Sequence, residues 1–275
     1  MCPQRRRHHR VLVTEVRPWL EGSYTETVGR DLFAATAELA HLVGWMSGDA
    51  GHQGPAQRYY LHSHRLAAEA GAAETAATAL RGLADQALDL GHVATAVRLA
   101  EAADRTGGTV PEPKARAYYA TTHARAAAAD HDPATARARL TAAHTAIGHA
   151  DPTPGTSWAA HYSPSRWAHE TARVHHRLGD LDAAEEHLHH ALHLGIDRRR
   201  TQAQVTADLG HVLLHRGDLD AALDTWTRFA DLATGIRSRR VTDSAADIAA
   251  RLATLPEPRA HHLLDQLTTT FDHAS

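Results

Sequence analysis

The chain has 275 residues, only 5% of them aromatic, and a formal net charge of −3 at pH 7 with histidine neutral. Alanine is abundant and β-favouring residues are scarce, which argues against an all-β fold. There is no apolar run of the roughly 20 residues that a membrane span needs, and no apolar signal-peptide stretch, so we expect a cytoplasmic protein. The single cysteine, Cys2, argues against a disulfide framework or a zinc site built on several thiolates.

The N-terminal segment MCPQRRRHHR is basic and poor in apolar residues. Such a composition cannot bury enough apolar surface to fold, so residues 1–16 are predicted to form a basic disordered tail. Four arginines without an interleaved aromatic residue make a weak nucleic-acid site, so a solvated tail is favoured over a DNA-binding arm.

An internal repeat follows over residues 17–275. A small residue recurs at a nearly constant interval, and most copies come directly after a turn such as LGHVATA, LGDLDAA or RGDLDAA. The aligned alanines are Ala56, Ala96, Ala136, Ala184, Ala222 and Ala260. The one longer interval, from Ala136 to Ala184, contains DPTPGTSW, which predicts a Pro/Gly loop at 150–158.

Each turn separates two stretches of helical periodicity, so the repeat predicts six helical pairs. The expected ranges are 31–70, 74–106, 112–148, 164–195, 198–234 and 238–272. At a fixed distance before most of the aligned alanines lies another small residue, for example Gly44, Ala84 or Gly210. Small residues that face each other allow the two helices of a hairpin to approach closely.

This pattern resembles the tetratricopeptide repeat, a helix-turn-helix unit with small residues at those two positions and bulky residues after them. The clearest copy runs from Ala203 to Thr234. The resemblance implies an all-α fold, a right-handed superhelical solenoid of about six tetratricopeptide-like hairpins. An irregular alanine-rich helical bundle is the alternative.

A second resemblance is dense over residues 17–100 and looser, at the level of the repeat, through residue 275. The strings RPWLEGSYTE, FAATAELAHLVGWMSGDAG, AQRYYLHSHRLAAEAG and QALDLG are similar to the tetratricopeptide region of actinobacterial helix-turn-helix regulators of the XRE type. In that family an N-terminal helix-turn-helix reads DNA, and the repeat region serves as a sensor or oligomerisation platform. The short basic segment before the match is too short for a DNA-binding domain. The resemblance therefore implies the regulatory half, and direct DNA binding by this chain is not expected.

Catalytic signatures are absent from the sequence. With Lys114 as the only lysine no phosphate-binding loop of the G-x-x-x-x-G-K type exists, and no G-x-S-x-G elbow occurs. His189 and His193, with Glu185 on the same stripe, are a geometrically possible metal pair, but histidine doublets are common along this chain. We therefore expect no enzyme activity, no cofactor and no metal site.

A tetratricopeptide superhelix presents its first helices on the concave side, and this places the candidate binding residues. Polar or aromatic side chains recur at fixed register positions on the helix that precedes each aligned alanine. The candidates are Trp45, Arg81, Asp85, Tyr118, Arg125, Arg166, His169, Arg173 and His211. Arg125, Arg166, His169 and Arg173 are expected to form a cationic cluster that holds a carboxylate or phosphate, unless they are exposed residues that pair with nearby acids.

Three functions fit these expectations. The first is a regulatory or scaffold protein that binds a peptide, a protein or a small-molecule signal in its concave groove, alone or as a homodimer. The second is a transcription regulator whose DNA-reading domain lies upstream or on a separate chain. The third is an accessory protein or enzyme of a biosynthetic pathway that reuses the solenoid. In-frame helix-turn-helix coding sequence directly upstream would favour the second.

Overall fold

The computed structural model describes residues 16–151, 153, 155, 157–196 and 198–272. Within these residues the chain forms helices and connecting turns and no strand. The predicted basic tail lies outside the described residues, except for Val16. None of the described helices is long and apolar enough to span a bilayer.

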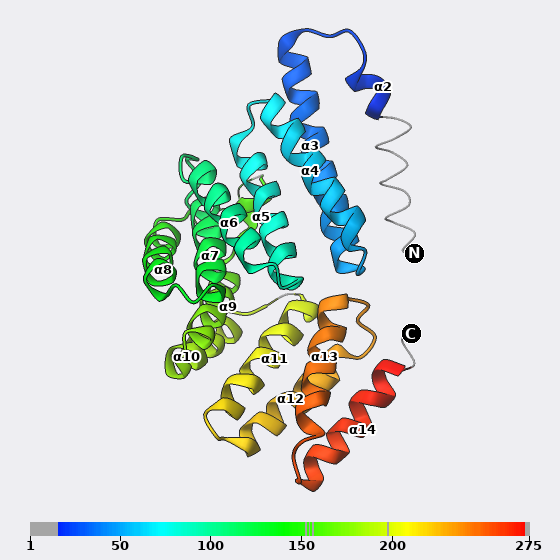
Figure 1. Ribbon diagram of the computed structural model, residues 1–275, viewed down its shortest axis with the longest axis vertical. Helices are drawn as coiled ribbons and strands as arrows, with labels where there is room; N and C mark the ends of the chain where they lie inside the picture. Colours follow the sequence, from blue (N-terminus) through cyan, green and yellow to red (C-terminus); the bar gives the residue numbers. More distant parts are fainter. Residues whose placement is uncertain (1–15, 152, 154, 156, 197, 273–275) are drawn as a thin grey trace. The chain divides into compact units, whose positions relative to one another are not determined.

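The chain divides into two compact units, which are described separately here as the N-terminal unit (1–163) and the C-terminal unit (164–275). Each unit contains three consecutive helix pairs (Figure 1). In the N-terminal unit these are α3 (Glu26–Asp49) with α4 (Gln53–Glu69), α5 (Ala73–Asp89) with α6 (Val93–Gly107), and α7 (Pro113–Ala129) with α8 (Pro133–Gly148). In the C-terminal unit they are α9 (Pro164–Arg177) with α10 (Leu181–His193), α11 (Arg199–His215) with α12 (Leu219–Ala233), and α13 (Arg239–Leu252) with α14 (Pro258–Asp272).

The six predicted pairs are thus confirmed, with one shifted boundary. The first helix of the first pair begins at Glu26 rather than near residue 31, because the Thr25 hydroxyl caps it by accepting a hydrogen bond from the Val28 amide at 3.4 Å. A short helix, α2 (Arg17–Leu20), precedes it and was not predicted. A 3-10 turn, η2 (Ala159–His161), follows the predicted Pro/Gly loop.

The Gly-Asp turn explains why the repeat is visible in the sequence. Gly217 ends α11 at a φ of 85°, a left-handed conformation that glycine adopts without steric cost. The next residue, Asp218, starts α12 by accepting a hydrogen bond from the Ala221 amide at 3.1 Å. Asp180 caps α10 in the same way. One glycine and one aspartate therefore close one helix and open the next.

Every one of the six aligned alanines is fully buried. In two of the pairs a glycine of the leading helix leaves room for an aromatic ring. A Cβ atom on Gly210 would lie 2.3 Å from Nε1 of Trp226, a fully buried side chain that donates to the Ala207 carbonyl. Tyr60 fills the corresponding space beside Gly44. In these two pairs an aromatic ring of the trailing helix therefore packs onto the backbone of a glycine in the leading helix.

We predict that Gly210→Ala lowers the free energy of unfolding by roughly 1–2 kcal/mol, because overpacking against Trp226 outweighs the better helix propensity of alanine. Gly48→Ala in α3 is the matched control, since its Cβ would meet only the Ala56 methyl at an ordinary 3.7 Å. This control should stabilise the protein. Urea unfolding followed by circular dichroism measures both, and a stabilised Gly210→Ala variant would contradict the packing argument.

Candidate functional site

All nine candidate residues lie on the leading helix of a pair. The leading helices of one unit contact each other, α3 with α5 and α5 with α7 in the N-terminal unit, and α9 with α11 and α11 with α13 in the C-terminal unit. We call the surface that they share the leading-helix face of that unit. Trp45, Arg81, Asp85, Tyr118 and Arg125 belong to the N-terminal unit, and Arg166, His169, Arg173 and His211 belong to the C-terminal unit.

In the N-terminal unit the candidates form a nearly buried ion cluster. Asp85 accepts from Arg81 on its own helix at 2.6 Å and from Arg125 on α7 at 3.1 Å. All three side chains are 10% exposed or less. The Arg81 guanidinium also lies 3.9 Å from the centre of the Tyr118 ring, a cation–π contact. These charges therefore hold α5 and α7 together.

The predicted Pro/Gly loop contributes a side chain that the register argument did not anticipate on this face. The Trp158 ring packs edge-on against His41 and Trp45 of α3, with ring centres 5.0 and 6.1 Å apart. Its Nε1 donates to the Tyr118 hydroxyl at 3.3 Å. Tyr162, also buried, packs against the Tyr118 ring at 5.0 Å. The chain thus covers part of its own leading-helix face with aromatic side chains.

His41 is the titratable group most affected by this cover. Burial, aided by the charge of Arg81 and opposed by Asp85, lowers the pKa of His41 from 6.5 to about 3. Its Nδ1 atom is buried and has no hydrogen-bond partner among the described residues. The imidazole is therefore neutral at pH 7, and it serves as a ring that packs against Tyr60 and Trp158.

The C-terminal unit carries a more exposed network that crosses its three leading helices. Asp208 on α11 accepts from His169 at 2.7 Å and pairs with Arg173 at 3.6 Å, both on α9. Burial opposes ionisation, yet the His169 hydrogen bond and the Arg173 charge hold the pKa of Asp208 well below its usual range. Arg173 keeps 46% of its side chain exposed and Asp208 keeps 32%.

The network continues from α11 to α13. His211 Nε2 lies 3.1 Å from Asp247, which also pairs with Arg251 at 3.3 Å. Burial lowers the pKa of His211, although Asp208 and Asp247 act in the opposite direction. We call Arg173, Asp208, His211, Asp247 and Arg251 the charge ladder. Four of its five side chains are at least 32% exposed, so they are available to a ligand.

The expected cationic cluster of Arg125, Arg166, His169 and Arg173 draws on both units, and each member has an acidic neighbour within its own unit. Arg125 pairs with Asp85, Arg166 with Glu170 at 3.2 Å, and His169 and Arg173 share Asp208. The register did not identify the acidic partner Asp208, because the position that corresponds to His169 in this repeat is Ala207, one residue earlier.

Histidines also meet outside the ladder. His176 and His215 approach with ring nitrogens 2.7 Å apart, and burial together with the His215 charge lowers the pKa of His176. On α10, His189 lies 3.6 Å from Glu185. These two residues and His193 were the ones considered for metal binding. Within the described residues no three His, Cys, Asp or Glu side chains are grouped so that they could hold a metal ion.

No protein-family model matches the chain, and no curated protein is significantly similar to it. Solved structures do resemble its fold. A thermophilic tetratricopeptide repeat protein of Thermus thermophilus has a TM-score of 0.54 at 19% identity, over 79% of this chain and 99% of that one. BtubC from P. vanneervenii has a TM-score of 0.58 at 15% identity, over 93% of each chain.

A third structure is a signal transduction ATPase of the STAND type with a tetratricopeptide repeat sensor, from Pyrococcus horikoshii. Its TM-score is 0.58 at 14% identity, over 96% of this chain and 40% of that one. At these identities the likeness concerns the fold alone. The fold is therefore of the tetratricopeptide-repeat type, as the aligned alanines predicted.

We predict that His41 makes the protein less stable in acid. The unfolded chain binds a proton near pH 6.5 while the folded chain does not until about pH 3, so the free energy of unfolding falls as the pH drops between these values. His41→Phe keeps the ring and removes the titration. It should reduce the slope of stability against pH by up to ~1.4 kcal/mol per pH unit.

Denaturant unfolding between pH 4 and 7 measures this slope. His261→Phe, at an exposed position on α14, is the control and should leave the slope unchanged. Equal slopes for wild type and His41→Phe would show that His41 titrates in the folded protein as it does in the unfolded chain, contrary to the expectation from its burial.

Proposed function

We propose that the protein is a non-catalytic regulatory or scaffold protein, and that the leading-helix face of its C-terminal unit binds a peptide or protein segment. The charge ladder carries this proposal. Partly exposed ion pairs contribute little to stability, so a series of them across three helices of one face is better explained by recognition than by folding. Neighbouring charges of both signs can bind acidic side chains and backbone amides of an extended segment.

The chemistry of the face favours a segment with a carboxylate at one point of contact. Arg173 and Arg166 lie on the same helix and are 46% and 37% exposed. A guanidinium presents several donors in a planar fork, so it can bind a second carboxylate while it keeps one acidic neighbour. The proposal places the acidic group of the segment next to these arginines, with Asp247 facing its amides or a basic side chain.

The N-terminal unit supports this role less well. Its candidates Arg81, Asp85 and Tyr118 are buried, and Trp158 covers part of the face that they share. The proposal therefore assigns the candidates of this unit to packing.

We further propose a link to transcriptional regulation, in the cytoplasm, which rests on the resemblance of residues 17–100 to the repeat region of XRE-type regulators. In this view the chain is a sensor or platform, and any contact with DNA is made through a partner or an additional domain. Coding sequence for an in-frame helix-turn-helix directly upstream would support direct regulation. Copurification with a separate DNA-binding protein would support a split arrangement.

We predict that the double variant Arg166→Ala with Arg173→Ala weakens partner binding about tenfold or more, because each arginine supplies charge-assisted hydrogen bonds. The partner is first identified by copurification and mass spectrometry, then purified for titration calorimetry. The matched control is Arg228→Ala with Arg237→Ala, which removes the same charge from two exposed positions outside the leading helices.

Circular dichroism should show equal helicity for both double variants. Equal affinity of the two for the purified partner would disprove the assignment of the binding face.

A further inference from the structure

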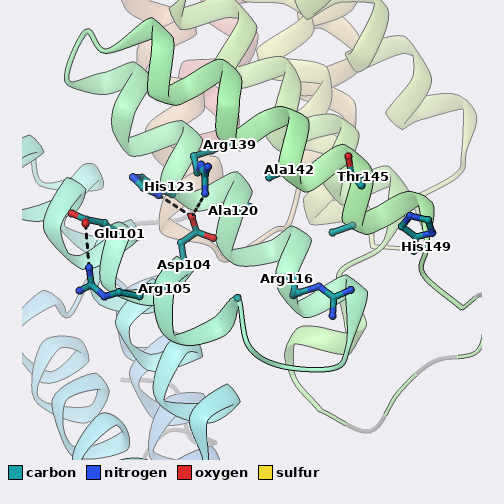
Figure 2. Close-up of a pocket in the computed structure, with 12 residues that line it drawn as sticks. Glu101, Asp104, Arg105, Arg116, Ala120, His123, Arg139, Ala142, Thr145 and His149 are labelled. Atoms are coloured by element: carbon teal, nitrogen blue, oxygen red, sulfur yellow. Dashed lines mark hydrogen bonds and ion pairs between the residues drawn. The ribbon is translucent and has the colours of Figure 1, made fainter.

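A separate feature of the N-terminal unit is a cavity of about 670 Å³ lined by α6, α7 and α8. Figure 2 shows Asp104 between His123 and Arg139, with Arg116 and His149 on the other side of the view. Ala120 and Ala142 contribute small side chains to the lining. The trailing helices α6 and α8 supply much of this wall, and none of the nine candidate binding residues takes part.

The repeat register explains why this junction is hollow. The two intervals between aligned alanines that lead up to it are equal, so each position of this junction has a counterpart one repeat earlier. In that earlier junction, Leu83 on α5 is buried and Leu99 on α6 packs against its cluster. Their counterparts here are His123 and Arg139, and Ala120 stands where the earlier helix has Leu80. Ala120 therefore removes most of a leucine side chain from this junction, and His123 and Arg139 put polar groups where the preceding junction has apolar ones.

The two polar residues that replace leucine, His123 and Arg139, both donate hydrogen bonds to Asp104. Asp104 Oδ2 accepts from His123 Nδ1 at 2.9 Å and from Arg139 at 3.4 Å, so the three helices are joined by polar contacts instead of apolar ones. Each buried leucine contributes about 1.5–3 kcal/mol of apolar transfer free energy, which this junction does not gain. Departures from good packing of this kind concentrate at functional sites.

Arg116 gives the cavity its charge. Its Nη1 donates to the carbonyls of Val110 and Pro111 at 2.8 and 2.7 Å, which fixes the guanidinium at the edge of the cavity. In the described part of the chain no carboxylate lies within ion-pair distance of Arg116. The two acids of the lining already have basic partners, Asp104 as above and Glu101 in its pair with Arg105 at 3.2 Å. One positive charge in the lining is thus uncompensated.

We propose that this cavity binds a small organic anion, a carboxylate or a phosphate ester, whose charged group pairs with Arg116 and whose compact apolar body lies over Ala120 and Ala142. Three observations support the assignment. The volume lies within the roughly 300–1,000 Å³ of small-molecule sites. The guanidinium is held in place before the ligand arrives, which reduces the entropy lost on binding. The alanine side chains offer an apolar wall. The site is independent of the charge ladder and of any peptide bound there.

Four matched probes test the charge requirement on the full chain by titration calorimetry. Benzoate and phenyl phosphate carry an anion on an aromatic ring, benzamide is a neutral analogue of benzoate, and benzylamine is a cation. We expect both anions to bind at millimolar concentration and the other two not to bind. Of the two anions, the tighter one identifies the natural head group as carboxylate or phosphate. Failure of both anions to bind, or equal binding of benzoate and benzamide, would overturn the proposal.

Two variants locate the binding in this cavity. Arg116→Gln should weaken benzoate binding at least about tenfold, the loss of a charge-assisted contact. Arg137→Gln, an exposed arginine on α8 outside the cavity, is its control and should bind like wild type. Because Arg116 also holds the loop at Val110 and Pro111, a second variant is needed that does not touch this contact.

Ala120→Leu is that variant, since it restores the leucine found at the same register position of the preceding junction. It should raise the melting temperature by filling the cavity and at the same time abolish benzoate binding. A purely structural cavity would give the first effect without any binding to lose. Undiminished benzoate binding in Ala120→Leu would show that the anion binds elsewhere and would overturn the proposal.

Discussion

The close approach of the two helices in each pair determines the rest of this structure. The aligned alanine is fully buried in all six pairs, and in five of them the leading helix has a second small residue at the corresponding register position, for instance Gly44 or Gly210. Alanine and glycine bury little apolar area, so the pair needs large rings nearby. Tyr60 and Trp226 supply them by packing onto glycine backbone, and Tyr119 does the same against Gly107. The distance between the helices and the position of the aromatic ring therefore depend on each other.

This constraint involves only the surfaces where helices cross, so the remaining faces of the leading helices are free to differ between units. The N-terminal unit uses them for a buried ion cluster under Trp158, and the C-terminal unit for an exposed charge ladder. The two units differ in how deeply these charged side chains are buried. In the N-terminal unit His41 is enclosed by aromatic rings, and its pKa is strongly lowered. In the C-terminal unit the charge ladder is more exposed, and its charged side chains remain accessible to solvent. Similar register positions therefore serve packing in one unit and, in our proposal, recognition in the other.

The fold was predictable from the sequence because its determinants are local. The aligned alanines and the Gly-Asp turns mark helix crossings and helix ends that lie close together along the chain, and no long-range information is needed to read them. The start of α3 was misplaced because a single Thr25 cap sets it. The position of Trp158 was not predictable, since a Pro/Gly loop has no periodicity, and only tertiary contacts show that its aromatic residues return to α3 and α7.

For the candidate site, the sequence predicted which helix each residue lies on, but not which partners its side chain contacts. Register places a side chain on a face, but it does not decide whether an acid on the next helix can reach it, as Asp208 reaches His169 and Arg173. The cavity was not predicted, although the sequence contains a signal for it, because Ala120, His123 and Arg139 stand where the preceding junction has leucines. The informative comparison is therefore between the residues that successive repeats have at one register position. Repeats share the same packing requirement, so a repeat without the usual packing residue marks a candidate functional position.

Helix α7 connects the two kinds of surface in the N-terminal unit. One side of it carries Tyr118 and Arg125 toward the ion cluster and Trp158, and another carries Arg116, Ala120 and His123 toward the cavity. Most of its residues are buried, so it cannot shift without disturbing neighbours on every side. In a repeat protein each pair contacts only adjacent pairs, and the effect of an anion in the cavity would be confined to the helices next to α7. Among these is α5, whose Asp85 holds Arg125 of α7, so this ion pair is the direct physical link between the cavity and the leading-helix face of the same unit.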